Sequence, residues 1–239
     1  MTDPSPSSPS ADTSGGDERA QAKRAMAWTH TARFLTTASR LSELPVSELP
    51  EIAFVGRSNA GKSTAINALT QQKRLAFASK TPGRTQHINL FELGPKLAAD
   101  ALFADLPGYG YAAVERGKKL RWQQVMAEYL EVRRNLAAIV MLVDSRLGFT
   151  ELDMKLLDFV GPRIGNGAVK MLVLLTKADK LSRRALDEAL GRAQDTIAPL
   201  IGESADVGVA PFSALSRQGV DDAAVWLHRS TAVPGTSAG

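Results

Sequence analysis

The residues best able to do chemistry form one short glycine-rich run. In chain order they are Gly56, Arg57, Ser58, Asn59, Ala60, Gly61, Lys62 and Ser63. The run fits the pattern G-x-x-x-x-G-K-[ST], in which glycines let successive backbone N–H groups wrap a phosphate chain. In that pattern Lys62 reaches the β- and γ-phosphates, and the Ser63 hydroxyl ligates Mg²⁺. A plain glycine-rich turn is the alternative, but a strand before the run and a helix after it favour a phosphate-binding loop.

A second run follows 43 residues after Lys62 and consists of Asp105, Leu106, Pro107 and Gly108. An aspartate in this position can hold Mg²⁺ through water, and the Gly108 N–H can meet a γ-phosphate. A strand that ends in a Pro-Gly turn would look the same. The run therefore gains its meaning from the phosphate-binding loop before it.

A third run, Thr176, Lys177, Ala178 and Asp179, indicates which base is bound. A carboxylate can accept two hydrogen bonds from guanine N1–H and N2–H₂, whereas adenine has no such donor pair, and the Lys177 stem can lie over the ring. The alternative is that Asp179 caps the helix expected from about Ser182. A fourth run, Phe212, Ser213 and Ala214, could offer a backbone N–H to guanine O6. Together the runs predict a site for a guanine nucleotide.

Alternating short apolar runs and longer helical patterns must position these residues. The near-continuous apolar strands predict a mostly parallel six-stranded sheet with helices on both faces, an α/β fold. A hairpin around Gly94-Pro95 predicts one antiparallel strand at the edge. The expected strands are 52–55, 87–93, 97–104, 138–143, 169–175 and 207–212, and the expected helices are 62–71, 117–133, 151–160, 183–199 and 218–229.

Length and composition narrow the remaining possibilities. The chain of 239 residues suggests one domain plus an appendage: a disordered Ser/Pro-rich tail over 1–24, a folded unit over 25–230 and a flexible end over 231–239. The absence of cysteine excludes disulfides, thiolate zinc sites and a cysteine nucleophile. Three scattered histidines disfavour a Ser-His-Asp triad. Short apolar runs and the lack of a secretory pattern predict a cytoplasmic protein that does not contact a membrane.

The amino-acid sequences of these motifs resemble those of one family of GTPases. The segments are GRSNAGKS (56–63), SKTPGRTQ (79–86), DLPGYGYA (105–112), DSR (144–146) and TKADK (176–180). They are similar to the EngB (YihA/YsxC) family of ribosome-biogenesis GTPases, among the TrmE-Era-EngA-EngB-Septin-like P-loop GTPases. The resemblance covers about residues 30–230. It implies a Ras-like fold that binds GTP or GDP with Mg²⁺, and a switch in assembly of the large ribosomal subunit, linked to cell division and septation. A monomer is the default expectation.

The resemblance also assigns two switch segments. The first spans about 73–86, where Thr85 would close on Mg²⁺ and the γ-phosphate and Thr81 is the competing candidate. The metal ligands would then be Ser63 and Thr85. The second switch follows Gly108 and would expose Tyr109 and Tyr111 to a partner, unless both tyrosines pack in the core. The nucleotide contacts implied for the first switch are Gly83, Arg84, Thr85, Gln86 and His87.

Two departures from the wider GTPase pattern affect these expectations. Thr176 replaces an Asn, which removes an amide that would tie the base loop to the phosphate-binding loop. Tyr109 stands where Ras-type enzymes place a water-orienting Gln, so the catalytic residue is unknown, and Lys62 and Thr85 are the best candidates for transition-state support. We expect slow turnover, on the order of 10⁻⁴ to 10⁻² s⁻¹. Asn59 resembles an asparagine that coordinates K⁺ in related GTPases, which gives a hypothesis of K⁺ activation.

Charge supplies the expectation about the partner. The excess of 29 Lys and Arg over 25 Asp and Glu gives a net charge of +4, which permits an RNA partner without demanding one. An ordinary solvated basic face is the alternative. A division adaptor without ribosome binding and a P-loop kinase or ATPase are the competing functions. Basic residues gather near both switches: Lys73, Arg74, Lys80, Arg84, Arg116, Lys118, Lys119, Arg121, Arg133 and Arg134.

Overall fold

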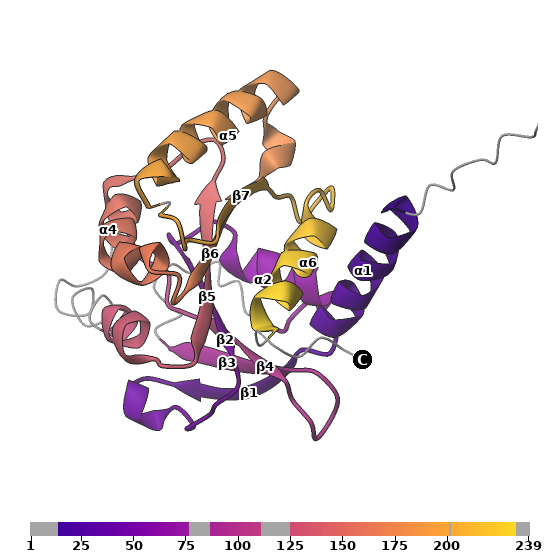
Figure 1. Ribbon diagram of the computed structural model, residues 1–239, viewed down its shortest axis with the longest axis vertical. Coiled ribbons are helices and arrows are strands. Elements are labelled where there is room, and N and C mark those ends of the chain that lie inside the picture. The colour runs from indigo at the N-terminus through magenta and orange to yellow at the C-terminus, as the bar shows by residue number, and fades with distance from the viewer. Residues whose placement is uncertain (1–13, 77–86, 111–124, 201, 233–239) are drawn as a thin grey trace, which may run out of the picture.

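The computed structural model describes residues 14–76, 87–110, 125–200 and 202–232, and its centre is a seven-stranded sheet of order β1-β3-β4-β2-β5-β6-β7 (Figure 1). Only β3 runs against its neighbours, β1 and β4; the other pairings are parallel. The strands are β1 (Arg33–Ala38), β2 (Glu51–Gly56), β3 (Ile88–Leu93), β4 (Ala101–Asp105), β5 (Leu136–Asp144), β6 (Lys170–Thr176) and β7 (Val207–Pro211).

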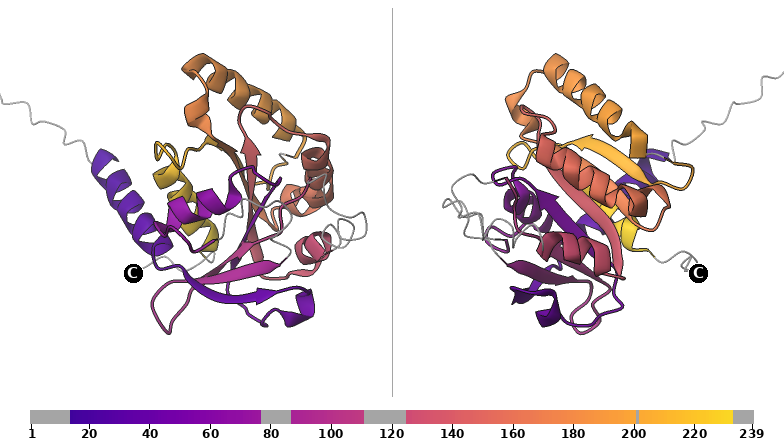
Figure 2. Two further views of the ribbon diagram at one scale, coloured as in Figure 1. Left: turned by 180° about the vertical axis from the view of Figure 1, so that it is seen from behind. Right: turned by 90° about the vertical axis from the view of Figure 1, so that its left-hand side faces the viewer.

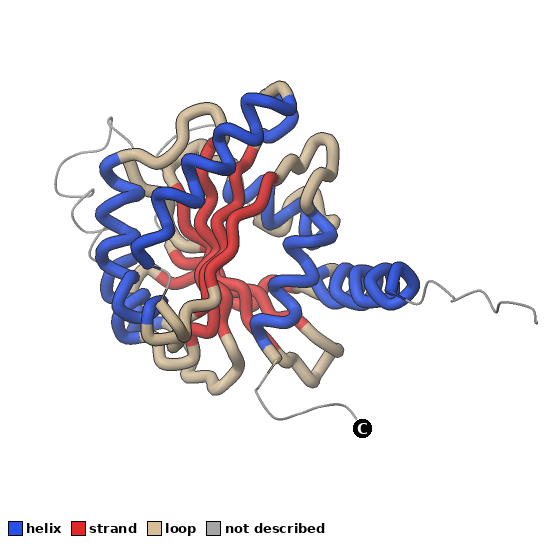
Figure 3. The backbone as a smooth tube through the Cα atoms, turned by 45° about the horizontal axis from the view of Figure 1, so that its top comes forward, coloured by secondary structure: helices blue, strands red, loops and turns tan. Residues whose placement is uncertain are grey.

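Helices cover both faces of the sheet (Figures 2 and 3). One face carries α1 (Ser14–Thr29), α2 (Lys62–Thr70) and α6 (Val220–Thr231). The other carries the helical residues 125–132, α4 (Glu151–Gly165) and α5 (Arg183–Ile197). Short 3₁₀ turns lie at η1 (Leu41–Glu43), η2 (Ala178–Lys180) and η3 (Ala198–Leu200). Strands β2, β4, β5 and β6 are almost wholly buried, because each is covered from both sides.

The predicted α/β fold class is confirmed, with two corrections to the sheet. It has seven strands rather than six, and the antiparallel strand β3 is second from the edge because β1 lies outside it. In β1 only Ala38 is buried, so the strand lacks the continuous apolar run that marked the central strands. An edge strand that is partly exposed leaves a weak pattern in the sequence.

The expected disorder over residues 1–24 is also wrong in part, because α1 begins at Ser14. The helix has little amphipathic pattern of its own, and it is held by packing against α6. Trp28 is buried edge-on against Phe103 and His228, and its Nε1 donates a hydrogen bond of 2.8 Å to Asp100 Oδ1. Residues 1–13 and 233–239 lie outside the described part of the chain, in which no helix has the length and apolarity needed to cross a membrane.

Candidate functional site

The glycine-rich run forms the loop between β2 and α2, as predicted. A Cβ at Gly56 would lie 2.8 Å from the Leu142 carbonyl oxygen of the neighbouring strand, so a larger residue would push the strands apart. Gly61 has a φ of +92° directly before the first turn of α2, a conformation that favours glycine. The loop therefore turns tightly into the helix N-terminus, where phosphate is favoured by free N–H groups and by the helix dipole.

Lys62 and Asp105 meet at the centre of this site. Strands β2 and β4 are parallel neighbours, so their carboxyl ends lie at the same edge of the sheet, and Lys62 Nζ donates to Asp105 Oδ1. Both side chains are buried, with exposed fractions of 8% and 1%. Asp105 Oδ2 has no hydrogen-bond partner within the described residues. A hard cation with its water shell would satisfy that oxygen, so the residues present fit Mg²⁺.

The second switch begins by continuing β4 alongside the phosphate-binding loop. Ser58 N donates to Tyr109 O at 2.8 Å, and Tyr109 N donates to Gly56 O at 3.3 Å. This places the Tyr109 ring inside the fold, 6% exposed, where its hydroxyl donates to Asp153 Oδ1 at 2.7 Å. Burial and the Asp153 carboxylate raise the pKa of Tyr109 far above its ordinary value, so the phenol stays protonated.

The expectation of an exposed aromatic is therefore wrong for Tyr109. Asp153 belongs to the first turn of α4, where it also accepts hydrogen bonds from the N–H and hydroxyl of Thr150. Thr150 occupies Asp153 Oδ2, so Oδ1 is left to accept the hydrogen bond from the Tyr109 hydroxyl. Tyr111 lies outside the described residues, as do Gly83, Arg84, Thr85 and Gln86 of the first switch.

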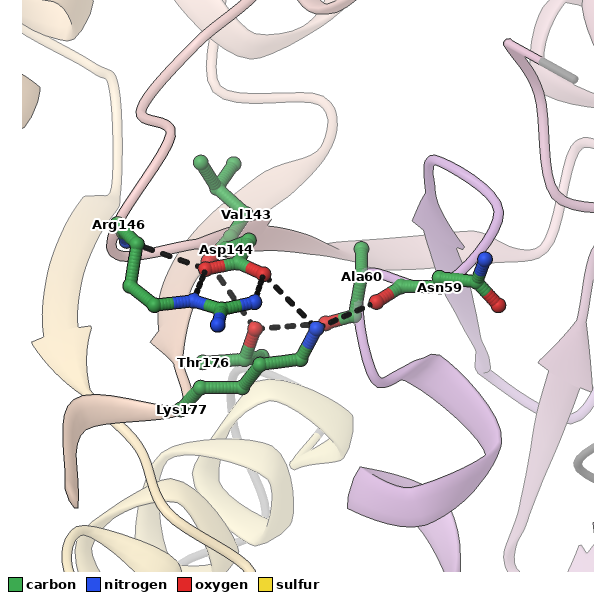
Figure 4. A network of polar contacts seen from close by, with 7 residues as sticks. All are labelled: Asn59, Ala60, Val143, Asp144, Arg146, Thr176 and Lys177. Carbon is green, nitrogen blue, oxygen red and sulfur yellow. Dashed lines mark hydrogen bonds and ion pairs between the residues drawn. The ribbon is translucent and has the colours of Figure 1, made fainter. Parts of the chain in front are cut away.

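The base loop follows β6, and Thr176 connects it to the phosphate-binding loop. From the sequence, Thr176 is expected to weaken this connection. Thr176 Oγ1 lies 2.6 Å from the Ala60 carbonyl oxygen and 3.2 Å from that of Val143, and donates to this pair (Figure 4). Lys177 Nζ donates to Asn59 O at 2.9 Å. The loss predicted for Thr in place of Asn is thus wrong, because the threonine hydroxyl reaches the loop backbone directly.

Asp179 and the segment after β7 come together as the motifs require. Ser213 Oγ donates to Asp179 Oδ1 at 2.6 Å, and this hydrogen bond holds the pKa of the carboxyl below its ordinary value. The alternative role for Asp179, capping α5, is taken by Ser182, whose side chain accepts from Ala185 N. Ser213 N already donates to Gln218 O. The next amide along the chain, that of Ala214, is therefore the donor that we assign to a base.

Asp144, at the end of β5, is part of the site. It begins the segment DSR (144–146), which carries part of the family resemblance but assigns it no contact. Its carboxylate binds Arg146 at 2.9 and 2.7 Å and Lys177 at 2.8 Å (Figure 4). Burial alone would raise the pKa of Asp144, but the hydrogen bonds from Arg146 and Lys177 outweigh it and hold the pKa well below its ordinary value. The DSR segment and the position of Asp144 beside Thr176 in the sheet register are the two signals that could have indicated this role.

The remaining predicted residues differ in outcome. His87 is exposed just before β3, and its Nδ1 lies 2.8 Å from Ser39 Oγ. Arg133 does not belong to a free basic face, because its guanidinium binds the buried Glu51 carboxylate at 2.6 and 2.9 Å. Lys73, Arg74 and Arg134 are exposed. The other basic residues named for the partner face, Lys80, Arg84, Arg116, Lys118, Lys119 and Arg121, lie outside the described residues.

The fold and the site together define a P-loop GTPase domain: a phosphate-binding loop between β2 and α2, an acidic residue on the neighbouring strand, and an aspartate-bearing base loop after β6. Residues 51–177 match a family model described as 50S ribosome-binding GTPase. The probable GTP-binding protein EngB of Acidovorax ebreus (strain TPSY) is 61% identical over 207 residues, covering 85% of this chain and 91% of that protein. Its counterpart from Albidiferax ferrireducens is 60% identical over 208 residues, covering 85% and 97%.

The chain belongs to the EngB family of GTP-binding proteins. Family membership makes it a GTPase in general terms and implies that it binds GTP and GDP. Two solved structures agree in fold. A probable GTP-binding protein engB aligns with a TM-score of 0.60 at 20% identity, covering 76% of this chain and 98% of that one. Era in complex with MgGDPNP and nucleotides 1506–1542 of 16S ribosomal RNA aligns at 0.62 and 20%, covering 79% and 59%.

Proposed function

We propose that this protein is a slow GTPase that acts as a nucleotide-dependent switch in assembly of the large ribosomal subunit, and that normal cell division and septation depend on it. The observation that carries the proposal is the match of residues 51–177 to a family described as 50S ribosome-binding GTPases. A guanine-reading Asp179 beside an intact phosphate-binding loop supports it. We further propose that the protein works in the cytoplasm as a monomer.

In this proposal the nucleotide lies along the carboxyl edge of the sheet. The loop from Gly56 to Ser63 wraps its phosphates, and Lys62 turns from Asp105 to the β- and γ-phosphates. Ser63 and Thr85 ligate Mg²⁺, Asp105 holds it through water, and the ion neutralises charge on the phosphates when bound. Asp179 accepts from guanine N1–H and N2–H₂, while Ala214 N–H donates to O6.

The placement of the second switch supports the proposal of slow hydrolysis. The Tyr109 hydroxyl is bound to Asp153 and so does not orient a water in place of the missing Gln. Lys62 and Thr85 remain the candidates for transition-state support. The Asn59 side chain points away from the Lys177 ammonium (Figure 4), which leaves it available for the K⁺ hypothesis.

The partner proposal rests on charge beside the first switch. Lys73 and Arg74 follow α2 directly and are exposed, and Arg134 is exposed after the helical residues 125–132. Cationic side chains hold RNA through its phosphates, and such contacts weaken steeply with salt. A basic group beside a switch would let the bound nucleotide control the grip on ribosomal RNA.

Co-sedimentation with ribosomal subunits tests the proposal. The purified protein is spun with large and small subunits in GDP and in a non-hydrolysable GTP analogue, across a salt series. We expect binding to the large subunit, mainly in the GTP state and weaker as salt rises, and reduced binding for a Lys73→Ala/Arg74→Ala variant with Lys96→Ala as the matched control. Binding in neither state would favour a division adaptor, and tighter binding of ATP than of GTP would favour a kinase or ATPase.

A further inference from the structure

The carboxylate of Asp144 gathers two cations at the edge of the base site. Its side chain is 7% exposed, and its two oxygens accept four hydrogen bonds (Figure 4). Oδ1 accepts from Arg146 N at 3.1 Å and from Arg146 Nε at 2.9 Å. Oδ2 accepts from Arg146 Nη2 at 2.7 Å and from Lys177 Nζ at 2.8 Å. Arg146 therefore fixes the carboxylate in one orientation, and the second oxygen is presented to Lys177.

Lys177 uses this contact to bridge two loops. The same ammonium donates to Asn59 O at 2.9 Å, so the side chain extends from the base loop to the phosphate-binding loop. Lysine has a long flexible side chain, and holding it in one conformation costs rotamer entropy. A counter-charge that is itself held rigidly offsets part of that cost. Asp144 supplies it from a third element, the end of β5.

The backbone around Asp144 does not need the carboxylate. Asp144 lies opposite Thr176 in the parallel β5–β6 ladder, and Ser145 N donates to Thr176 O at 2.9 Å. The base loop is also tied to the phosphate-binding loop by Thr176 Oγ1. Loss of charge at Asp144 should therefore leave the strands in place and loosen only the side chains of Lys177 and Arg146.

We propose that Asp144 is a positioning residue of the nucleotide site, which holds the Lys177 stem flat against the guanine ring and thereby slows nucleotide release, with Arg146 fixing the carboxylate. This inference rests on the nucleotide site proposed above. It assigns Asp144 no contact with the base edge, which Asp179 reads. The effect of Asp144 on nucleotide release must therefore pass through Lys177 and must not depend on the N2 amino group of guanine.

A double-mutant cycle tests this coupling on the full-length protein. The variants are Asp144→Asn, Lys177→Met and the two together, and the readout is the release rate of fluorescent GDP measured by stopped flow. We expect Asp144→Asn to speed release about tenfold, the effect of one charge-assisted hydrogen bond. In the Lys177→Met background the same change should add nothing, because the residue through which it acts is gone. Effects that multiply in the double variant would overturn the proposal.

A second ligand and a matched control separate positioning from other roles. Inosine diphosphate lacks the N2 amino group, and Asp144→Asn should speed its release by the same factor as that of GDP. A factor found with GDP alone would place Asp144 in edge recognition and overturn the proposal. Glu188→Gln removes a carboxylate of the exposed ion pair with Arg184 on α5, 3.0 Å apart, and should leave release unchanged.

The outcomes remain distinct if a variant folds poorly. Unfolding curves in urea show whether Asp144→Asn retains wild-type stability. If it does not, Arg146→Gln keeps the Asp144 charge and should speed release in the same direction by a smaller factor, again only when Lys177 is present. A wild-type protein that fails to bind GDP would contradict the nucleotide site itself. Wild-type binding with unchanged release in both Asp144→Asn and Arg146→Gln would overturn only the role of Asp144.

Discussion

Asp179 has a polar side chain beside each of its carboxylate oxygens. Ser213 Oγ donates to Oδ1 at 2.6 Å, and Lys180 Nζ lies 3.3 Å from Oδ2. The serine hydrogen bond lowers the pKa of the Asp179 carboxyl and fixes the plane of the carboxylate, which a guanine needs for two parallel hydrogen bonds. In the proposed nucleotide site, base selectivity would therefore depend on a pair of residues from two loops, one after β6 and one after β7.

We expect Asp179→Ala to weaken GDP binding roughly 30- to 150-fold, because two charge-assisted hydrogen bonds are lost. Ser213→Ala should weaken it less, since the carboxylate stays but is no longer held. Titration with fluorescent GDP measures both, and Ser182→Ala, which changes the cap of α5 and not the base site, is the control. Unchanged GDP binding in Asp179→Ala would instead favour the alternative function, a P-loop kinase or ATPase.

At this scale the sequence predicted positions better than contacts. The runs at Lys62, Asp105 and Asp179 could be placed together because the carboxyl ends of parallel strands share one edge. The Thr176 hydroxyl could not be seen to reach Ala60 O, because that depends on how two loops far apart in the chain approach. Tyr109 was misplaced for the same reason: its partner Asp153 lies 44 residues away, in the cap of α4.

Among the elements, the helical residues 125–132 are anchored to β2 by a buried charge. Glu51 has no exposed surface, and it accepts from Tyr129 OH and from the guanidinium of Arg133. Burial and the Glu51 carboxylate raise the pKa of Tyr129 well above its ordinary value, so the phenol remains a donor. Arg133 also donates to Pro45 O. This anchor fixes the end of the helix that follows the second switch.

Arg133→Ala should lower the free energy of unfolding by about 3 kcal/mol, because it leaves the Glu51 charge buried without its cation. The neighbouring Arg134 is exposed, so Arg134→Ala should change stability by less than about 0.5 kcal/mol. Urea denaturation of the two variants gives the comparison. Equal effects would mean that the ion pair between Arg133 and Glu51 does not stabilise the fold.

The elements that the sequence did not predict are those held by tertiary contacts alone. The central strands carry continuous apolar runs and were identified, whereas β1 is an edge strand with one buried residue. Likewise α1 has a weak pattern, and its stability comes from Ala25, Met26 and Trp28 packing against α6. Local pattern cannot reveal an element whose partner comes from the other end of the chain.

At the scale of the whole molecule, the two helical layers leave the phosphate loop, the base loop and the start of the second switch together at one edge of the sheet. At that edge, backbone hydrogen bonds of Ser58 and Tyr109 join the start of the second switch to the phosphate loop, and the Tyr109 side chain is buried. The start of the second switch is thus coupled to the proposed phosphate-binding loop, and its Tyr109 hydroxyl is engaged by Asp153.

We therefore expect the isolated protein to hydrolyse GTP on the order of 10⁻⁴ to 10⁻² s⁻¹, as unassisted switch GTPases do. Phosphate release under single-turnover conditions measures the rate, in KCl and in NaCl at equal ionic strength. A faster rate in KCl that is lost in Asn59→Ala would support a cation held by Asn59, and equal rates would remove that hypothesis. Turnover near 1 s⁻¹ without any partner would contradict the arrangement argued here, because it would require a catalytic side chain that Tyr109, bound to Asp153, does not provide.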